Sequence, residues 1–262
     1  MAAVIECKNV TYSYPLTDKP AISEMDFSFE KGKFYGVIGE NGSGKTTLCA
    51  ILRGFAPSFY QGELKGEVLF EGKPLSEYGG EISTKIGYVF QNPFTQISGV
   101  KDTVFEEVAY GLENFGIPVD EIVERVERVM KLTNIEHLAM KSPFELSGGQ
   151  KRRVAIAGIM AMKPEVLVLD EPAAGLDPEG RRNIFDAIEE YRRTESATVI
   201  IVSHSMEDMA ERCDNIAVLN HSNLIASGDV DSVFSQPELL LQAGLDVPEI
   251  TRISMILRDG GI

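Results

Sequence analysis

The sequence contains no long apolar run. Its apolar stretches, such as VLVL at 166–169 and VIIV at 199–202, fall far short of the about 18 residues that a membrane-spanning helix needs, and they suit buried strands instead. The first ten residues, MAAVIECKNV, lack the basic segment and apolar stretch of an export signal. We therefore expect a protein of the cytoplasm, which leaves docking on a membrane protein open.

Basic residues are also scarce. The chain has 25 Lys and Arg against 40 Asp and Glu, a formal net charge of −15. A protein whose main partner is nucleic acid presents a basic face to the phosphate backbone, so this balance argues against that class. It leaves nucleotide binding open, because a nucleotide needs only a local cradle.

Cysteine and histidine are equally sparse. The three cysteines, Cys7, Cys49 and Cys213, are widely spaced and form no C-x-x-C pair. We interpret them as buried or idle thiols in a reducing compartment rather than as metal ligands or redox centres. His137 and His221 stand alone and receive the same interpretation.

Strand-like and helix-like patterns alternate along most of the chain. This order predicts an α/β fold, with a parallel sheet and crossover helices. Helical periodicity dominates about 93–162, and we interpret that block as an insertion into the core. Strands are expected over 4–14, 23–38, 66–72, 85–91, 166–170, 197–203 and, as a hairpin, 215–228, and KFYGVIG at 33–39 is expected as a short buried strand that runs into the glycine-rich loop. Helices are expected over 45–55, 103–116, 119–132, 148–162 and 178–193.

The segment GENGSGKT, residues 39–46, matches the phosphate-binding pattern G-x-x-x-x-G-K-[ST]. It follows a predicted strand and opens a predicted helix, which is the context that this pattern requires. Its glycines let the backbone wrap around phosphates, and the helix N-terminus adds about half a positive charge. We expect Lys45 to reach the β- and γ-phosphates and the Thr46 hydroxyl to bind Mg²⁺.

Two carboxylates end the apolar strand VLVLDE at 166–171. Two acids at the carboxyl end of a sheet are costly unless they serve a cation or a site. Asp170 is suited to the Mg²⁺ shell, and Glu171 is suited to orient and polarise an attacking water.

Three further residues stand at or near predicted strand ends. Gln91 is either a turn residue or a site residue, and the sequence alone leaves both open. For His204 we favour contact with the γ-phosphate or the attacking water, because it follows VIIVS at the ligand edge of the sheet. Tyr14 either stacks on a base or belongs to the core.

A second anion-binding pattern lies in ELSGGQKRRVAIAGIMAM, residues 145–162. Its Ser-Gly-Gly turn opens a predicted helix, so backbone N–H groups there are placed to cradle an anion. One chain therefore carries two phosphate-binding devices.

Taken in order, these motifs resemble those of the nucleotide-binding subunits of ATP-binding-cassette (ABC) transporters, over nearly the whole chain. Walker A is GENGSGKT, the signature is LSGGQ at 146–150, Walker B is VLVLD, and the D-loop is AGLD at 174–177. The resemblance implies a P-loop NTPase (RecA-like) core with an inserted helical subdomain and an antiparallel β subdomain. The core and β subdomain would span about 1–92 and 163–229, the helical subdomain about 93–162, and a tail about 230–262.

The resemblance also implies the site residues, with ATP and Mg²⁺ as cofactors. In this family two cassettes pair head to tail, and each signature caps the ATP held by the other chain, much as an arginine finger acts in trans. Catalysis would involve Glu171, His204 and Gln91, and Mg²⁺ would be held by Thr46, Gln91 and Asp170. ATP would be bound by Tyr14, Gly39, Glu40, Asn41, Gly42, Ser43, Gly44, Lys45, Thr46 and Thr47, and in trans by Ser147, Gly148, Gly149, Gln150 and Asp177.

A narrower resemblance points to energy-coupling-factor (ECF) ATPases, which are related to cobalt-importer ATPases. It is carried by QNPFTQ at 91–96, VFEEVAYGLENFGIP at 104–118 and the tail at 233–251. It implies an energy-coupling ATPase at the cytoplasmic face of the membrane that drives uptake of a vitamin, metal ion or similar small substrate. Its partners would be a second ATPase chain, a transmembrane coupling subunit and a substrate-binding membrane subunit.

Two other classes fit less well. A soluble ABC ATPase of DNA repair, chromosome structure or translation usually has two cassettes in one chain, a long coiled coil or zinc-binding cysteines, and this sequence has none of these. A plain P-loop kinase or GTPase has no use for LSGGQ, and the guanine-reading N-K-x-D pattern is absent.

Two surfaces are expected to meet partners. The segment from Gln91 to about Tyr110 carries apolar groups in a non-periodic stretch, and we expect part of a groove for a membrane partner's cytoplasmic helix there; the alternative is a packed loop. Its apolar groups are Phe94, Ile97 and Val100. The tail forms an apolar stripe that serves either packing within the chain or contact between two cassettes, and the stripe comprises Ile250, Ile253, Ile256 and Leu257.

Overall fold

A computed structural model of the chain describes residues 2–259. They divide into two compact units: within the described range the first comprises residues 2–79 and 200–259, and the second comprises residues 80–199. The division falls inside strand β8 (Thr198–Val202), and each unit is described by itself.

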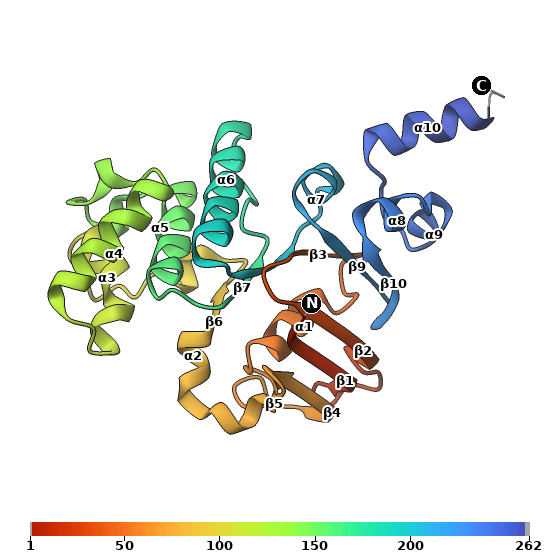
Figure 1. Ribbon diagram of the computed structural model, residues 1–262, viewed down its shortest axis with the longest axis horizontal. Coiled ribbons are helices and arrows are strands. Elements are labelled where there is room, and N and C mark those ends of the chain that lie inside the picture. Colours follow the sequence, from red (N-terminus) through yellow and green to blue (C-terminus); the bar gives the residue numbers. More distant parts are fainter. Residues whose placement is uncertain (1, 260–262) are drawn as a thin grey trace. The chain divides into compact units, whose positions relative to one another are not determined.

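An antiparallel sheet forms one part of the first unit. It contains β1 (Ala3–Ser13), β2 (Ile22–Glu30), β4 (Glu63–Phe70) and β5 (Lys73–Pro74) in the order β2-β1-β4-β5 (Figure 1). Along β1 the alternation of apolar and polar residues buries Ile5 and Cys7, and beyond a register irregularity that follows Cys7 it buries Val10 and Tyr12. Burial raises the pKa of the Cys7 thiol to about 12, in keeping with an idle thiol.

The phosphate-binding segment of the first unit lies between a buried strand and a helix. Strand β3 (Phe34–Gly39) is buried along its whole length and pairs in parallel with β9 (Asn215–Asn220). Strand β9 continues into β10 (Asn223–Asp229) as the predicted hairpin. Helix α1 (Lys45–Leu52) begins directly after the glycine-rich loop, as the sequence predicts. The short helices α7 (Met206–Arg212) and η1 (Leu75–Glu81) are not anticipated by the sequence patterns.

The tail of the first unit folds into three short helices. These are α8 (Val230–Phe234), α9 (Pro237–Gln242) and α10 (Glu249–Asp259), and Figure 1 shows α10 extending beyond the other two. Phe234, Leu240 and Val247 are buried, so the tail up to Val247 belongs to the folded unit. Helix α10 instead leaves Ile253 and Leu257 51% and 43% exposed.

The second unit contains a pair of parallel strands and a group of helices. Strand β6 (Ile86–Val89) follows α2 (Ile82–Lys85) and pairs with β7 (Val166–Asp170) so that Val89 lies opposite Leu169. Parallel neighbours end at the same edge, so this register brings the residues that follow Val89 and Leu169 to one edge.

Three helices of the second unit match the predicted helical block closely. They are α3 (Val104–Asn114), α4 (Val119–Leu132) and α5 (Gly148–Ala161), with the single turns η2 (Pro93–Thr95), η3 (Glu136–Leu138) and η4 (Pro143–Glu145). Helix α6 (Pro178–Glu195) matches the helix predicted separately over 178–193. Helices α3, α4 and α5 lie together in Figure 1. The range 93–162 contains helices and turns but no strand. The subdomain boundaries themselves remain a prediction.

None of the helices in residues 2–259 combines the length and the apolar character required to cross a bilayer.

Candidate functional site

The glycine-rich loop of the first unit has the backbone shape of an anion cradle. Gly44 sits immediately before α1 at φ +107, a conformation that a side chain rarely tolerates. A Cβ there would collide with the carbonyl oxygen of Ala21. Among the described residues no side chain caps α1, and its first turn contains no acidic residue. Its N-terminal N–H groups are therefore suited to a phosphate.

Lys45 holds the loop in this shape. Its ammonium donates hydrogen bonds to the carbonyl oxygens of Gly39 at 2.7 Å and Glu40 at 2.8 Å, and the side chain is buried. The buried hydroxyl of Ser43 has no hydrogen-bond partner within residues 2–259. A buried hydroxyl without a partner is costly, and a phosphate oxygen would satisfy it. The loop therefore fits the triphosphate that the sequence predicts.

Tyr14 is tied to the same helix. Its hydroxyl lies 3.1 Å from the Thr47 hydroxyl, and its half-buried ring meets the Tyr12 ring edge to face at 5.0 Å. Tyr12 in turn donates to the carbonyl oxygens of Tyr60 and Gln61. These contacts hold Tyr14 beside the phosphate loop, where an aromatic face is useful for stacking on a base.

His204 shares a cleft of about 420 Å³ with the start of the phosphate loop. The cleft is lined by Gly39, Glu40, Asn41, His204, Met206, Gly244, Leu245 and Asp246. The last three belong to the tail, and sequence reasoning missed them. Gly244 has φ +71, and a Cβ there would collide with the Glu40 side chain. The available signal was a glycine between two helical stretches of the tail, but nothing in the sequence linked it to the phosphate loop.

The second unit carries the predicted acids. Asp170 ends β7 and Glu171 follows it, both buried. Gln91 follows β6, so the parallel register places it at the same edge. Glu171 has φ +53, a left-handed backbone that costs a residue with a side chain about 1 kcal/mol or more. The chain thus turns sharply at the predicted catalytic carboxylate.

The Q-N-P-x-x-Q segment folds back onto its own strand. Asn92 caps η2 by accepting from the Phe94 N–H, and Pro93 occupies the first helical position. Gln96 donates to the Tyr88 carbonyl at 2.9 Å and accepts from the Phe90 N–H at 3.2 Å. The motif therefore fixes the course of the chain directly after Gln91.

The signature segment opens α5 with a complete capping box. The Ser147 hydroxyl accepts from the Gln150 N–H, and the Gln150 side chain accepts from the Ser147 N–H. A pocket of about 450 Å³ adjoins this helix start and is lined by His137, Leu138, Ser147, Gly149, Gln150, Arg153, Gly175, Leu176 and Asp177. His137, interpreted from the sequence as an isolated residue, is thus a lining residue of the signature pocket.

Arg152 is a second residue of this region that sequence reasoning missed. It is 7% exposed, and its guanidinium donates to the Glu171 carbonyl at 2.5 Å and the Gln91 carbonyl at 3.1 Å. Burial lowers its pKa, whereas the negative charge of Glu171 raises it. Its partners are backbone atoms 61 and 19 residues away, which no local pattern reveals.

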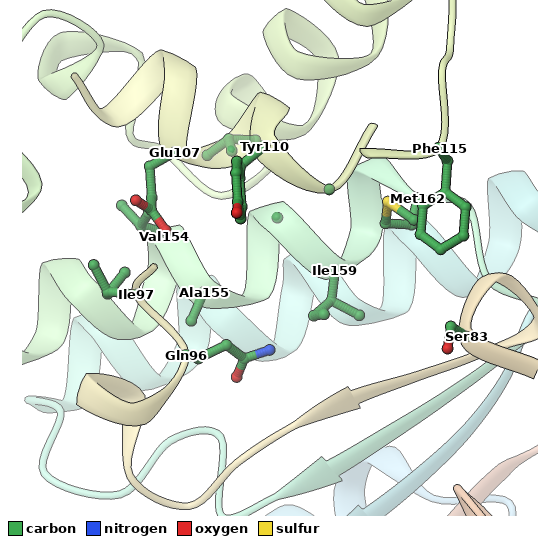
Figure 2. A pocket seen from close by; sticks show the side chains of 13 residues that line it. Ser83, Gln96, Ile97, Glu107, Tyr110, Phe115, Val154, Ala155, Ile159 and Met162 are labelled. Carbon is green, nitrogen blue, oxygen red and sulfur yellow. The ribbon is translucent and has the colours of Figure 1, made fainter. Parts of the chain in front are cut away.

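An apolar groove of about 250 Å³ lies in the second unit between α3, α5 and the segment that follows η2 (Figure 2). Figure 2 shows Ile97, Tyr110, Ile159 and Met162 around it. Phe94 and Val100 are exposed but do not line the groove; Lys151 lies over the Phe94 ring at 4.8 Å. Of the three apolar residues that the sequence singled out, the groove therefore includes Ile97.

The predicted site residues thus form one set in each unit. The first unit holds Tyr14, residues 39–47 and His204; the second holds Gln91, Asp170, Glu171, residues 147–150 and Asp177. Residues 2–259 contain no cluster of three or more His, Cys, Asp or Glu that could hold a metal ion by itself. The hydroxyl, amide and carboxylate oxygens of Thr46, Gln91 and Asp170 are nevertheless the donors that Mg²⁺ prefers, together with substrate phosphates.

Comparisons with known proteins all find ATP-binding proteins of ABC transporters. The family model described as ABC transporter matches residues 22–174. The energy-coupling factor transporter ATP-binding protein EcfA2 of Clostridium acetobutylicum is 40% identical over 265 residues, covering 98% of this chain and 90% of that protein. The structure of CbiO1 from Clostridium perfringens, part of the ABC transporter complex CbiONQ, superposes with a TM-score of 0.80 at 33% identity, covering 97% of this chain and 100% of that one.

A dimeric ATP-binding cassette in a post-hydrolysis state, bound to ADP and Pi, is also similar. It has a TM-score of 0.75 and 25% identity, and covers 86% of this chain and 98% of that one. Together with CbiO1, this neighbour confirms the predicted P-loop NTPase cassette fold.

Proposed function

Because this chain belongs to the ABC transporter family of ATP-binding proteins, we propose that it is the ATP-hydrolysing, energy-coupling subunit of an ECF-type importer. The importer takes up a vitamin, a metal ion or a similar small substrate, and the subunit works at the cytoplasmic face of the membrane. The observation that carries this proposal is the phosphate cradle at Gly39–Thr46, present in one chain with the strand-end acids and a capped signature helix.

The first unit supplies ATP binding in this proposal. Tyr14 stacks on the base, and the loop N–H groups and Lys45 bind the phosphates. The Ser43 hydroxyl donates a hydrogen bond to a phosphate oxygen. His204 contacts the γ-phosphate from the cleft that it shares with the loop.

The second unit supplies hydrolysis. Mg²⁺, when bound, neutralises charge on the phosphates; Asp170 and Gln91 of this unit would hold it together with Thr46, which belongs to the first unit. Glu171 accepts a hydrogen bond from the attacking water and polarises it. Its buried position keeps that interaction strong.

A second ATPase chain completes each site. The Ser147 hydroxyl and the N–H groups of Gly148 and Gly149 contact the γ-phosphate bound by the partner, and Asp177 approaches from the D-loop. The Ser147 hydroxyl oxygen accepts from the Gln150 N–H in the capping box, so its own hydrogen remains available to donate. ATP thereby joins the two chains, and hydrolysis separates them.

The apolar groove of the second unit is the docking site for a cytoplasmic helix of the transmembrane coupling subunit. Its walls come mainly from α3, α5 and the segment that follows η2, and Ile97, Ile159 and Met162 offer an apolar lining for such a helix. The one buried acid in it, Glu107, is engaged with the Ser98 N–H and hydroxyl at 2.6 and 2.8 Å. Apolar side chains of the partner therefore supply most of the binding.

Substituting Ile97 with Asp is expected to abolish transport by the assembled importer while leaving ATP binding by the isolated subunit unchanged. A charge in this lining must lose its water when an apolar helix docks, and nothing there compensates it. Substrate uptake into vesicles and ATP binding are measured on the same variant. The matched control is Val100→Asp, which places the same charge at a residue that is 66% exposed outside the groove.

Gly158→Phe gives the same test without adding charge. A Cβ at Gly158 meets nothing within 4 Å, so a side chain can start there, and the ring is expected to occupy part of the groove that Gly158 lines. Normal transport by both Ile97→Asp and Gly158→Phe would place the docking site elsewhere. Normal ATPase activity in a protein that never associates with membranes would favour the soluble ABC ATPase class instead.

Helix α10 contacts the second ATPase chain. Ile250, Ile253 and Leu257 are spaced to lie on one helical face, and all three are exposed, so packing within the chain does not account for the stripe. The side chain of Ile256 lies outside the described residues.

Leu257→Asp is expected to weaken pairing of the two ATPase chains in the absence of ATP by about tenfold, because a charge would then lie in an apolar contact. Leu241→Asp is the control, since Leu241 is 49% exposed on α9. Pairing is followed by analytical ultracentrifugation. Equal pairing by both variants would remove α10 from the interface. Removal of everything after Asp229 is a poorer test, because it also deletes the buried Phe234, Leu240 and Val247.

A further inference from the structure

Arg152 of the second unit bonds to two chain segments, one at Gln91 and one at Glu171. It stands on α5, five residues after Ser147, and its two terminal nitrogens reach the carbonyls of Gln91 and Glu171. A guanidinium has a planar fork of donors, so two carbonyls bound in this way are fixed relative to each other as well as to the helix. Both belong to residues assigned here to magnesium binding or hydrolysis.

The carbonyl of Glu171 belongs to a residue whose backbone conformation is unfavourable by itself. The residue has φ +53, and its carbonyl accepts from the Ala174 N–H at 3.2 Å as well as from Arg152. A left-handed residue with a side chain persists when its surroundings over-determine it. Rotation of the Glu171 peptide would redirect the carboxylate, so the Arg152 bond also constrains where that carboxylate points.

The positive charge of Arg152 is buried, and its burial must be compensated. Arg152 is 7% exposed, and burying a guanidinium is unfavourable unless hydrogen bonds compensate the loss of water. The two carbonyl dipoles provide that compensation, because charge-assisted hydrogen bonds are about twice as strong as neutral ones. If either carbonyl moved away, the buried charge would lose a partner, so the arrangement resists displacement.

We infer that Arg152 is a positioning residue that holds the backbones of Gln91 and Glu171 in the geometry for hydrolysis and ties that geometry to the signature helix. The inference rests on the proposed function of Glu171. Helix α5 is continuous from Gly148 to Ala161. The end that caps the partner's ATP and the residue that sets this chain's own water-polarising carboxylate therefore lie on one rigid element.

Arg152→Met tests the inference, because methionine fills the buried space without offering a donor. We expect kcat for ATP to fall about 10- to 100-fold, as is typical when a catalytic group loses its positioning, with KM nearly unchanged. Arg152→Lys, which keeps the positive charge but loses the planar fork of donors, should fall between Arg152→Met and the unchanged protein. Lys151→Met, which removes a neighbouring charge from the same helix, should keep kcat near its original value.

A double-mutant cycle separates positioning from general damage. In a Glu171→Gln background, Arg152→Met should cost little further activity, because Arg152 acts through that carboxylate. Single-turnover hydrolysis is measured with this chain and its natural partner if it has one. An equal loss in both backgrounds, or a rise in KM with kcat unchanged, would overturn the inference while leaving the role of Glu171 intact. Should Arg152→Met not fold, Arg152→Lys in the two backgrounds gives the same decision.

Discussion

Replacing Glu171 with glutamine is expected to lower ATP hydrolysis by about 10² to 10⁴, the range typical of losing a positioned base. Glutamine keeps the size of the side chain but cannot accept a proton or polarise water as a carboxylate does. Lys45, Thr46 and Asp170 are untouched, so Mg-ATP should still bind. The signature can still close on the γ-phosphate, and the ATP-bound pair should accumulate.

The measurement is steady-state hydrolysis together with size-exclusion chromatography in Mg-ATP. Glu165→Gln is a suitable control, because Glu165 is a carboxylate of the same unit that pairs with Lys85 at 2.8 Å. It directly precedes β7 and so lies at the opposite end of that strand from Asp170 and Glu171. Hydrolysis by Glu171→Gln at the original rate would show that another residue handles the water. The role assigned to the acid after β7 would then be wrong.

Lys45→Ala is expected to have the opposite effect on pairing. The ammonium is buried and holds the Gly39 and Glu40 carbonyls at 2.7 and 2.8 Å, so its removal releases the loop as well as a positive charge. ATP affinity should fall by about 10- to 100-fold, because a charge-assisted hydrogen bond is worth about 1.5–3 kcal/mol. The closed pair should then be missing at ATP concentrations that pair the original protein.

Titration calorimetry of ATP binding provides the direct measurement for Lys45→Ala, and the chromatography described above shows the missing pair. Lys31→Ala serves as control, since Lys31 is an exposed lysine of the same unit that pairs with Glu71. If Lys45→Ala binds ATP as tightly as the original protein, the cradle at Gly39–Thr46 does not hold the phosphates. The two principal variants thus separate failure of hydrolysis from failure of binding.

The fold was largely predictable where local pattern and environment agree. Helix α4 spans 119–132 and strand β7 spans 166–170, both at their predicted bounds, because a strong amphipathic period and a fully apolar run each have one compatible structure. Helix α7 and η1 escaped prediction because they are short and stabilised by their surroundings rather than by periodicity.

The candidate site was predictable to the extent that its chemistry is local. Residues 39–46 can be recognised from the sequence because one loop must supply many consecutive N–H groups. Arg152 and Gly244 cannot be recognised in this way, because each contacts residues distant along the chain. Arg152 bonds to Gln91 and Glu171, and Gly244 lies against Glu40. A linear pattern contains no information on such pairings, which arise only when the chain folds.

The capping box of the signature helix has a consequence for the speed of the cycle. Ser147 and Gln150 satisfy each other's backbone donors within one chain, so the helix start is already ordered before any partner arrives. Ordering a segment on association would add an entropic penalty to every encounter. Here that penalty falls once, during folding, and the helix start that we propose to contact the partner's nucleotide is preorganised. In the proposed function, two chains that meet and part in every turnover can therefore reuse the same contact without refolding it.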